Sequence, residues 1–167
     1  MGVDDDFTVF AGARWASLVR AGVLLGCTPD AAEDLAQTAL TRCFVSWRKV
    51  SGAEDRDAYV YRILLNCHRD SRRRRWGEMP TDRIPERAEA DPTHTVDLAD
   101  AVGRALATLS PKLREAVVLR YYAHLSERQV AAVLGIAPGT VKSRVSRGLN
   151  ALAEDPALND LDRGGTW

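Results

Sequence analysis

The order of capping and turn residues between positions 126 and 152 constrains the fold of this chain more than any other feature. Ser126 is followed three residues later by Gln129, which is the pattern of a capping box at a helix start. Gly135 is suited to end that helix in the left-handed conformation, and Pro138 is suited to begin another. These residues predict two short helices joined by a tight turn. Ala137 stands where serine or threonine would be expected to cap the second helix.

The second of these helices has two faces of different chemistry. Val141, Val145 and Leu152 are expected to face the core. The opposite face carries Thr140, Lys142, Ser143, Arg144, Ser146, Arg147 and Asn150. Short hydroxyls between long cations let a helix approach base edges while arginine reaches guanine or phosphate. The pattern predicts a helix-turn-helix that binds DNA; the alternative is an amphipathic helix with a solvated charged face.

A second basic surface is expected on a helix over residues 57–76. Its apolar face would hold Val60, Ile63, Leu64 and Cys67. Its other face carries Tyr59, Arg62, Asn66, Arg69, Arg73 and Trp76 at steps of three or four residues. Aromatic rings between arginines suit unstacked bases and a phosphate backbone. The arginines at 72–75 alone would equally suit the negative end of a helix dipole, so the stripe reaching back to Tyr59 is what favours nucleic acid.

The charges are segregated along the chain, although the formal net charge is zero. Residues 1–40 carry six acids and two arginines, and residues 66–76 carry five arginines and one aspartate. Residues 77–100 carry seven acids and two arginines, whereas residues 112–150 carry seven basic residues and two acids. Two basic surfaces separated by an acidic spacer are therefore expected, and the zero total does not exclude a nucleic-acid binder.

Apolar residues recur at helical spacing through most of the chain, which predicts an all-α fold. One helix is expected to bury Leu98, Val102, Ala105, Leu106 and Leu109, and the next Leu113, Ala116, Val117 and Tyr121. Residues 77–95 contain three prolines and no periodic apolar set, which is typical of a linker. We therefore predict two small helical domains, 1–76 and 96–154, a flexible linker over 77–95 and a flexible tail over 155–167.

A helix is also expected to begin at Thr28–Pro29, with threonine as the cap. Leu35, Ala39, Cys43 and Trp47 would form its buried stripe. A different face carries Asp30, Glu33, Gln37, Leu40, Thr41 and Phe44. Acids mixed with apolar side chains suit a protein-docking surface, but acids that compensate the helix dipole beside minor core residues fit the same pattern.

The sequence gives no sign of catalysis or of a bound metal. Cys27, Cys43 and Cys67 form no CxxC pair, and Cys67–His68 is the only cysteine–histidine neighbour pair, so buried free thiols, no metal site and no cofactor are expected. Paired carboxylates, a nucleophile–base set and a glycine-rich phosphate loop are all absent, so we do not expect an enzyme. The acidic N-terminus has no signal peptide or long apolar run, which predicts a cytoplasmic protein.

Over nearly its whole length, the chain resembles an alternative bacterial sigma factor of the extracytoplasmic-function class. Asp30–Gln37 looks like the segment of region 2 that binds core polymerase, and Tyr59–Asn66 with the following arginines looks like the helix that recognises the minus-ten element. Leu109–Ala116 and Gly139–Arg147 are similar to region 4, and the last of these is the most specific match.

The resemblance implies roles for the residues found above. The polymerase-binding residues, on the clamp helices of the beta-prime subunit, would be Asp30, Glu33, Asp34, Gln37, Leu40 and Phe44. The minus-ten helix would use Tyr59, Arg62, Asn66, Arg69 and Arg73, and Asn66 with the loop Ser51–Asp57 would read or trap a flipped minus-ten base. The minus-thirty-five element would be read by Thr140, Lys142, Ser143, Arg144, Ser146 and Arg147. The flap of the beta subunit is a further expected partner, and an anti-sigma factor is left open.

Two other classes of protein compete with this interpretation. A stand-alone helix-turn-helix regulator would use residues 1–76 to sense a ligand or to dimerise, which predicts an apolar pocket or a dimer seam there and leaves the stripe from Tyr59 to Trp76 unexplained. A small all-helical enzyme would need the catalytic groups that the sequence lacks.

Overall fold

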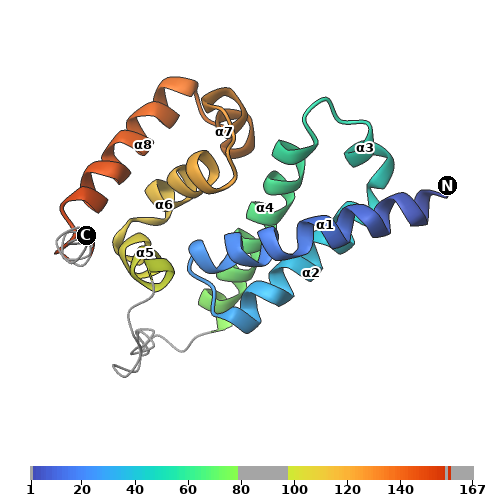
Figure 1. Ribbon diagram of the computed structural model, residues 1–167, viewed down its shortest axis with the longest axis horizontal. Coiled ribbons are helices and arrows are strands. Elements are labelled where there is room, and N and C mark those ends of the chain that lie inside the picture. The colour runs from blue at the N-terminus through green and yellow to red at the C-terminus, as the bar shows by residue number, and fades with distance from the viewer. Residues whose placement is uncertain (1, 79–97, 157, 159–167) are drawn as a thin grey trace, which may run out of the picture.

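The computed structural model describes residues 2–78, 98–156 and 158, which form helices and no strand, as the all-α prediction required. The helices lie in two groups (Figure 1). The first group comprises α1 (Val3–Leu24), α2 (Pro29–Val45), α3 (Trp47–Ser51) and α4 (Arg56–Glu78). The second comprises α5 (Leu98–Thr108), α6 (Pro111–Val117), the π-helical turn η1 (Val118–Tyr122), α7 (Glu127–Leu134) and α8 (Pro138–Ala153). Most of the predicted linker and tail, residues 79–97 and 159–167, lies outside the described residues.

The start of α2 follows the expected capping chemistry. The Thr28 hydroxyl accepts a hydrogen bond from the backbone N–H of Ala31 at 3.4 Å, and Pro29 occupies the first turn. The helix is shorter than predicted, because it ends at Val45 and the chain turns at Ser46. Trp47 is buried as expected but belongs to the short helix α3, which we did not predict and which takes up the first residue of the expected loop, Ser51.

The helix-turn-helix is formed by α7 and α8 as predicted. Ser126 Oγ accepts from the backbone N–H of Gln129 at 3.2 Å, and the Gln129 side chain accepts from the backbone N–H of Ser126, so the capping box is closed. Gly135 ends α7 with φ +67°, a conformation that favours glycine, and Ala137 begins α8 without a side-chain cap. The helix α8 packs closely on α6, since a Cβ on Gly148 would lie 2.6 Å from Val117 Cγ2.

The π-helical turn η1 explains one of the two places where our prediction of the second core was wrong. Tyr121 was expected to continue the stripe of Val117, but it is 52% exposed. A π-helical turn contains about one residue more than an α-helical turn, so the following side chains are rotated about the axis. Tyr122 faces the first group instead, and its hydroxyl donates to the backbone carbonyl of Ser17 at 3.1 Å. Val102 was also expected to be buried and is 37% exposed.

The two groups of helices pack directly against each other, with α1 against α5 and η1 and with α4 against α7 (Figure 1). Arg114 on α6 joins them through carbonyl groups at the C-terminal end of α5 and of α1. Its Nε and Nη2 donate to the carbonyls of Leu106 and Ala107, both at 2.7 Å, while Nη1 donates to the carbonyl of Leu25 at 3.2 Å. Gly26 has φ +104°, a backbone conformation that favours glycine, and a Cβ there would force Nη1 of Arg114 to shift.

Candidate nucleic-acid and protein-docking surfaces

The predicted recognition helix α8 lies on the outer side of the second group, away from α1–α4 (Figure 1). Val141 is buried and Val145 half-buried on its inner face. Its outer face exposes Lys142, Ser143, Ser146 and Arg147, with Thr140 and Arg144 half-buried at the edges. The Arg147 guanidinium lies back along the helix, with Nε 3.3 Å from the carbonyl of Ser143 and Nη2 3.4 Å from its hydroxyl. The outer face is thus a continuous cationic and hydroxyl surface.

The predicted minus-ten stripe of α4 is only partly exposed. Arg62, Asn66 and Arg73 are exposed, whereas Tyr59 is half-buried against the hydrophobic core. Arg73 lies 3.5 Å from a carboxylate oxygen of Asp70 in a surface ion pair. The stripe therefore presents Arg62, Asn66, Arg73 and the 69% exposed Trp76 to the surface. Arg69 is engaged differently.

Arg69 is bound by a carboxylate from the other group of helices. Its Nη2 lies 2.6 Å from Oε2 of Glu115 on α6, and its Nε donates to Oε1 at 3.2 Å. The Glu115 side chain is only 6% exposed. A two-pronged pair of this kind is the strongest arrangement available to a guanidinium and a carboxylate. In this arrangement of the helices, the guanidinium is occupied and bridges the two groups.

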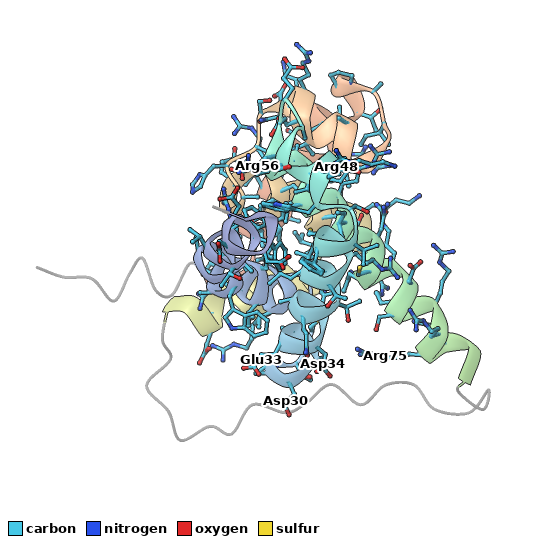
Figure 2. The ribbon with its side chains drawn as sticks, turned by 90° about the vertical axis from the view of Figure 1, so that its right-hand side faces the viewer. Asp30, Glu33, Asp34, Arg48, Arg56 and Arg75 are labelled. Carbon is cyan, nitrogen blue, oxygen red and sulfur yellow. The ribbon has the colours of Figure 1, made fainter. Side chains whose placement is uncertain are left out.

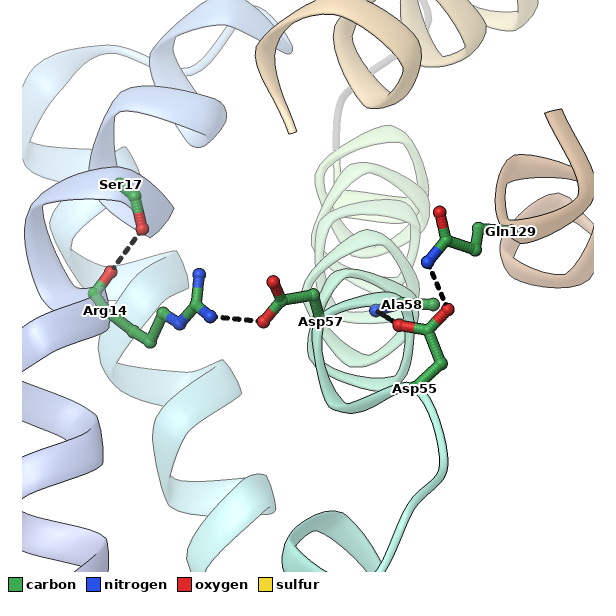
Figure 3. Close-up of polar contacts among 6 residues, drawn as sticks. All are labelled: Arg14, Ser17, Asp55, Asp57, Ala58 and Gln129. Carbon is green, nitrogen blue, oxygen red and sulfur yellow. Dashed lines mark hydrogen bonds and ion pairs between the residues drawn. The ribbon is translucent and has the colours of Figure 1, made fainter. Parts of the chain in front are cut away.

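The loop that precedes α4 is joined to the helix-turn-helix (Figure 3). Asp55 caps α4, because its Oδ1 accepts from the backbone N–H of Ala58 at 3.1 Å. Its other carboxylate oxygen accepts from Nε2 of Gln129, the capping-box residue of α7. One carboxylate thus ties the starts of α4 and α7 together. Sequence spacing could not have revealed this contact between residues 74 positions apart.

The other side of the same loop is anchored on α1 (Figure 3). The Arg14 guanidinium pairs with the carboxylate of Asp57, and the Ser17 hydroxyl donates to the carbonyl of Arg14 at 2.9 Å. The predicted base-trapping loop is therefore held between α1 and α7.

The predicted polymerase-docking face of α2 is narrower than expected. Its acids gather near the helix start, where Asp30, Glu33 and Asp34 are exposed (Figure 2). Gln37 is exposed one turn on. Leu40 is 7% exposed, and the exposed surface therefore excludes it, because α2 packs against both α1 and α4.

Phe44 lies farther along the same helix. It is 47% exposed, and its ring centroid lies 4.9 Å from that of Phe7 on α1. The docking face is therefore a cluster of acids followed by a partly exposed aromatic ring.

The buried titratable groups of α2 and α4 are held in their neutral forms. Burial raises the pKa of the Cys43 thiol to about 11 and also raises the pKa of Cys67, so neither is a reactive thiolate. All three cysteines are free. Burial, and then the charge of Arg72, lowers the pKa of His68 to about 4. Within residues 2–78, 98–156 and 158, no group of histidine, cysteine or acidic side chains could hold a metal ion.

None of the helices in the described part of the chain is both long and apolar enough to span a membrane.

Known proteins match both groups of helices. The family described as Sigma-70, region 4 matches residues 99–152, which span α5 to α8. The RNA polymerase sigma-E factor of Streptomyces coelicolor is 35% identical over 97% of this chain and 92% of its own length. The ECF RNA polymerase sigma factor SigM of Mycobacterium tuberculosis is 36% identical over 81% of this chain and 69% of its own. The chain belongs to the extracytoplasmic-function RNA polymerase sigma factors. This assignment accounts for the first group as well as for the helix-turn-helix.

A solved sigma factor also shares the arrangement of the two groups. The sigma factor RpoE of Bartonella quintana, determined in complex with the anti-sigma factor NepR, matches with a TM-score of 0.71 and 30% identity. The match covers 92% of this sigma factor and 97% of that chain. CnrH, determined with the cytosolic domain of CnrY, has the same fold at 22% identity and a TM-score of 0.64.

Proposed function

We propose that this sigma factor binds core RNA polymerase in the cytoplasm and directs initiation at promoters through two DNA contacts. The first group, residues 1–76, would bind polymerase and the minus-ten element, and the second, residues 96–154, the minus-thirty-five element. The observation that carries the proposal is the exposed cationic and hydroxyl face of α8 on a helix-turn-helix inside the matched region 4. A stand-alone regulator is disfavoured, because sigma-factor similarity extends over 97% of the chain.

The deciding experiment is run-off transcription with purified core polymerase on a promoter library. The expected result is stable binding to core and transcripts that start at a common promoter sequence. A chain that neither binds core nor selects start sites would show the proposal to be wrong.

Within the proposed minus-thirty-five site, Arg147→Ala should relax the base preference at one position. A two-pronged contact from arginine to guanine contributes about 1–3 kcal/mol of discrimination. The measurement is binding, in complex with core polymerase, to a library of promoters in which the minus-thirty-five element varies and the minus-ten element is fixed. The comparison is Arg73→Ala on α4, which should weaken binding on all sequences and flatten its salt dependence, as expected for a phosphate contact. An equal loss on every sequence for Arg147→Ala would remove base reading from this residue.

Within the proposed polymerase-binding face, Asp34→Arg should weaken binding to core by about tenfold or more. Reversing a charge in a complementary interface introduces repulsion as well as removing attraction. The measurement is the affinity for core polymerase by fluorescence titration. Asp100→Arg, a reversal at an exposed acid of α5, is the matched control and should leave the affinity unchanged. An unchanged affinity for Asp34→Arg would exclude this acid from the interface.

We further propose that the packed arrangement of the two groups is a free or inhibited form. Arg69 and Asp55 belong to the proposed minus-ten surface, and both are occupied by residues of the second group. Contact of both groups with one promoter therefore requires these pairs to separate. An anti-sigma factor is a fitting partner for the packed form, because the Bartonella quintana sigma factor was determined with one.

A further inference from the structure

A hollow of about 330 Å³ lies between α2 and the C-terminal half of α4. Pockets of this volume accommodate small-molecule ligands. The hollow is not part of the surfaces described above, although one residue of the acidic face, Asp34, is among the residues that line it.

The polar residues that line the hollow are suited to binding an anion. They are Thr38, Arg42, Ser71, Arg74 and Arg75, with Asp34 as the one carboxylate. Arg42 lies 3.4 Å from a carboxylate oxygen of Asp70, so Arg74 and Arg75 are the cations of the lining for which the described residues supply no carboxylate partner. Two such cations match the two charges of a phosphate monoester dianion. Asp34 on α2 and Arg75 on α4 come from opposite walls and lie at the same end of the molecule (Figure 2). Guanidinium groups and hydroxyls are the usual partners of phosphate oxygens.

In the described part of the chain, one buried nitrogen among the residues that line the hollow has no hydrogen-bond partner. His68 lines it and is only 5% exposed, and its Nδ1 has no hydrogen-bond partner among the described residues. Buried side-chain nitrogens are rarely left without a partner. The lowered pKa of His68 keeps the ring neutral at pH 7, so its N–H can donate to an anion without adding a buried charge.

The apolar residues that line the rest of the hollow indicate what kind of group could accompany the phosphate. They are Cys27, Ala31, Leu35 and Cys67, and the lining contains no phenylalanine, tyrosine or tryptophan on which a nucleobase could stack. We propose that the hollow binds a small phosphomonoester, whose phosphate lies among Arg42, Arg74 and Arg75 and whose short aliphatic body lies against this apolar wall. A DNA phosphate fits less well, because it is a diester with one charge and a substituent on each side.

The test is titration of the full chain with glycerol 3-phosphate at constant ionic strength, while nuclear magnetic resonance follows the imidazole nitrogens of His68. A saturable shift of these signals is expected. Arg75→Gln should weaken the binding about tenfold by removing one charge-assisted contact. Arg104→Gln on α5, another exposed arginine, is the matched control and should keep the wild-type affinity. Arg75 is itself exposed, so its replacement is not expected to disturb folding.

Three results would overturn the proposal. One is a shift that grows linearly without saturating, which indicates general ion screening. The second is equal affinity for dimethyl phosphate, a singly charged diester. The third is a response of His68 to duplex DNA but not to glycerol 3-phosphate, which would make the hollow part of a DNA contact. Saturation by glycerol 3-phosphate, together with the loss in Arg75→Gln alone, supports it.

Discussion

Arg69→Ala is expected to destabilise the packed arrangement of the two groups of helices by about 3 kcal/mol. The reason is the carboxylate of Glu115, which is 6% exposed and would be left buried without its cation. Removing one partner of a buried pair leaves an uncompensated charge, which is far more unfavourable than losing a surface contact. The expected loss lies at the low end of the range for buried pairs, because the Arg69 side chain is 34% exposed.

The loss can appear in two measurements, because the chain can relieve it in two ways. If the groups stay packed, urea unfolding followed by tryptophan fluorescence shifts to lower denaturant. If they separate, Glu115 becomes hydrated, and small-angle scattering shows a larger radius of gyration with little change in unfolding. Arg73→Ala is the control, since the Arg73 side chain is 80% exposed in its pair with Asp70. Its replacement should lower the free energy of unfolding by less than about 1 kcal/mol. No difference between the two variants in either measurement would contradict the prediction.

The double variant Arg69→Met/Glu115→Leu sharpens this test. Replacing a buried ion pair by apolar side chains of similar size is often neutral or stabilising. The double variant should therefore regain the stability of the packed arrangement that Arg69→Ala loses. The single and the double variant both lack the arginine at position 69. Comparison of the single and double variants separates the role of Arg69 in packing from its proposed role in binding DNA.

The parts of the fold that the sequence predicted well depend on local chemistry. The capping box of Ser126 and Gln129, the left-handed Gly135 and the proline starts of α2 and α8 each act within one helical turn. A local rule needs no knowledge of the neighbouring helices. The helix-turn-helix was for this reason predictable almost to the residue, including the missing side-chain cap at Ala137.

The parts that the sequence did not predict depend on packing between distant segments. Leu40 is buried because α2 is covered on two sides, and Tyr121 is exposed because of the π-helical turn. The pairs of Arg69 with Glu115 and of Asp55 with Gln129 join residues 46 and 74 positions apart. A helical pattern states which residues share a face, but it does not state what that face meets.

His68 is the one buried polar group for which a local signal was present. It follows Leu64 by four residues and Cys67 by one, so it falls on the apolar face of α4, and both of those residues are buried. The predicted apolar face of Val60, Ile63, Leu64 and Cys67 contains hydrophobic residue types alone and therefore leaves out the histidine. Its burial has a consequence that can be measured in solution.

Below about pH 6.5 the protein is expected to lose up to about 3 kcal/mol of stability through His68 alone. The pKa of His68 is lowered from 6.5 to about 4 in the folded chain. Between these values the unfolded chain binds a proton that the folded chain does not, so acid favours unfolding. Above pH 7.5 the histidine is neutral in both states and contributes no pH dependence. The loss therefore develops between about pH 7 and pH 4 and is absent at higher pH.

The measurement is urea unfolding of the wild type and of His68→Leu from pH 8 to pH 4, in buffers without phosphate. Acidic groups titrate in both proteins, so the difference between the two curves isolates the histidine. Above pH 7.5 the difference between the two free energies of unfolding should be constant, because it then reflects only the packing of leucine in place of histidine. Toward pH 4 it should change by about 3 kcal/mol in favour of the variant, which has no ring to protonate. Parallel curves over the whole range would mean that His68 is hydrated or that it has found a partner for its charged form.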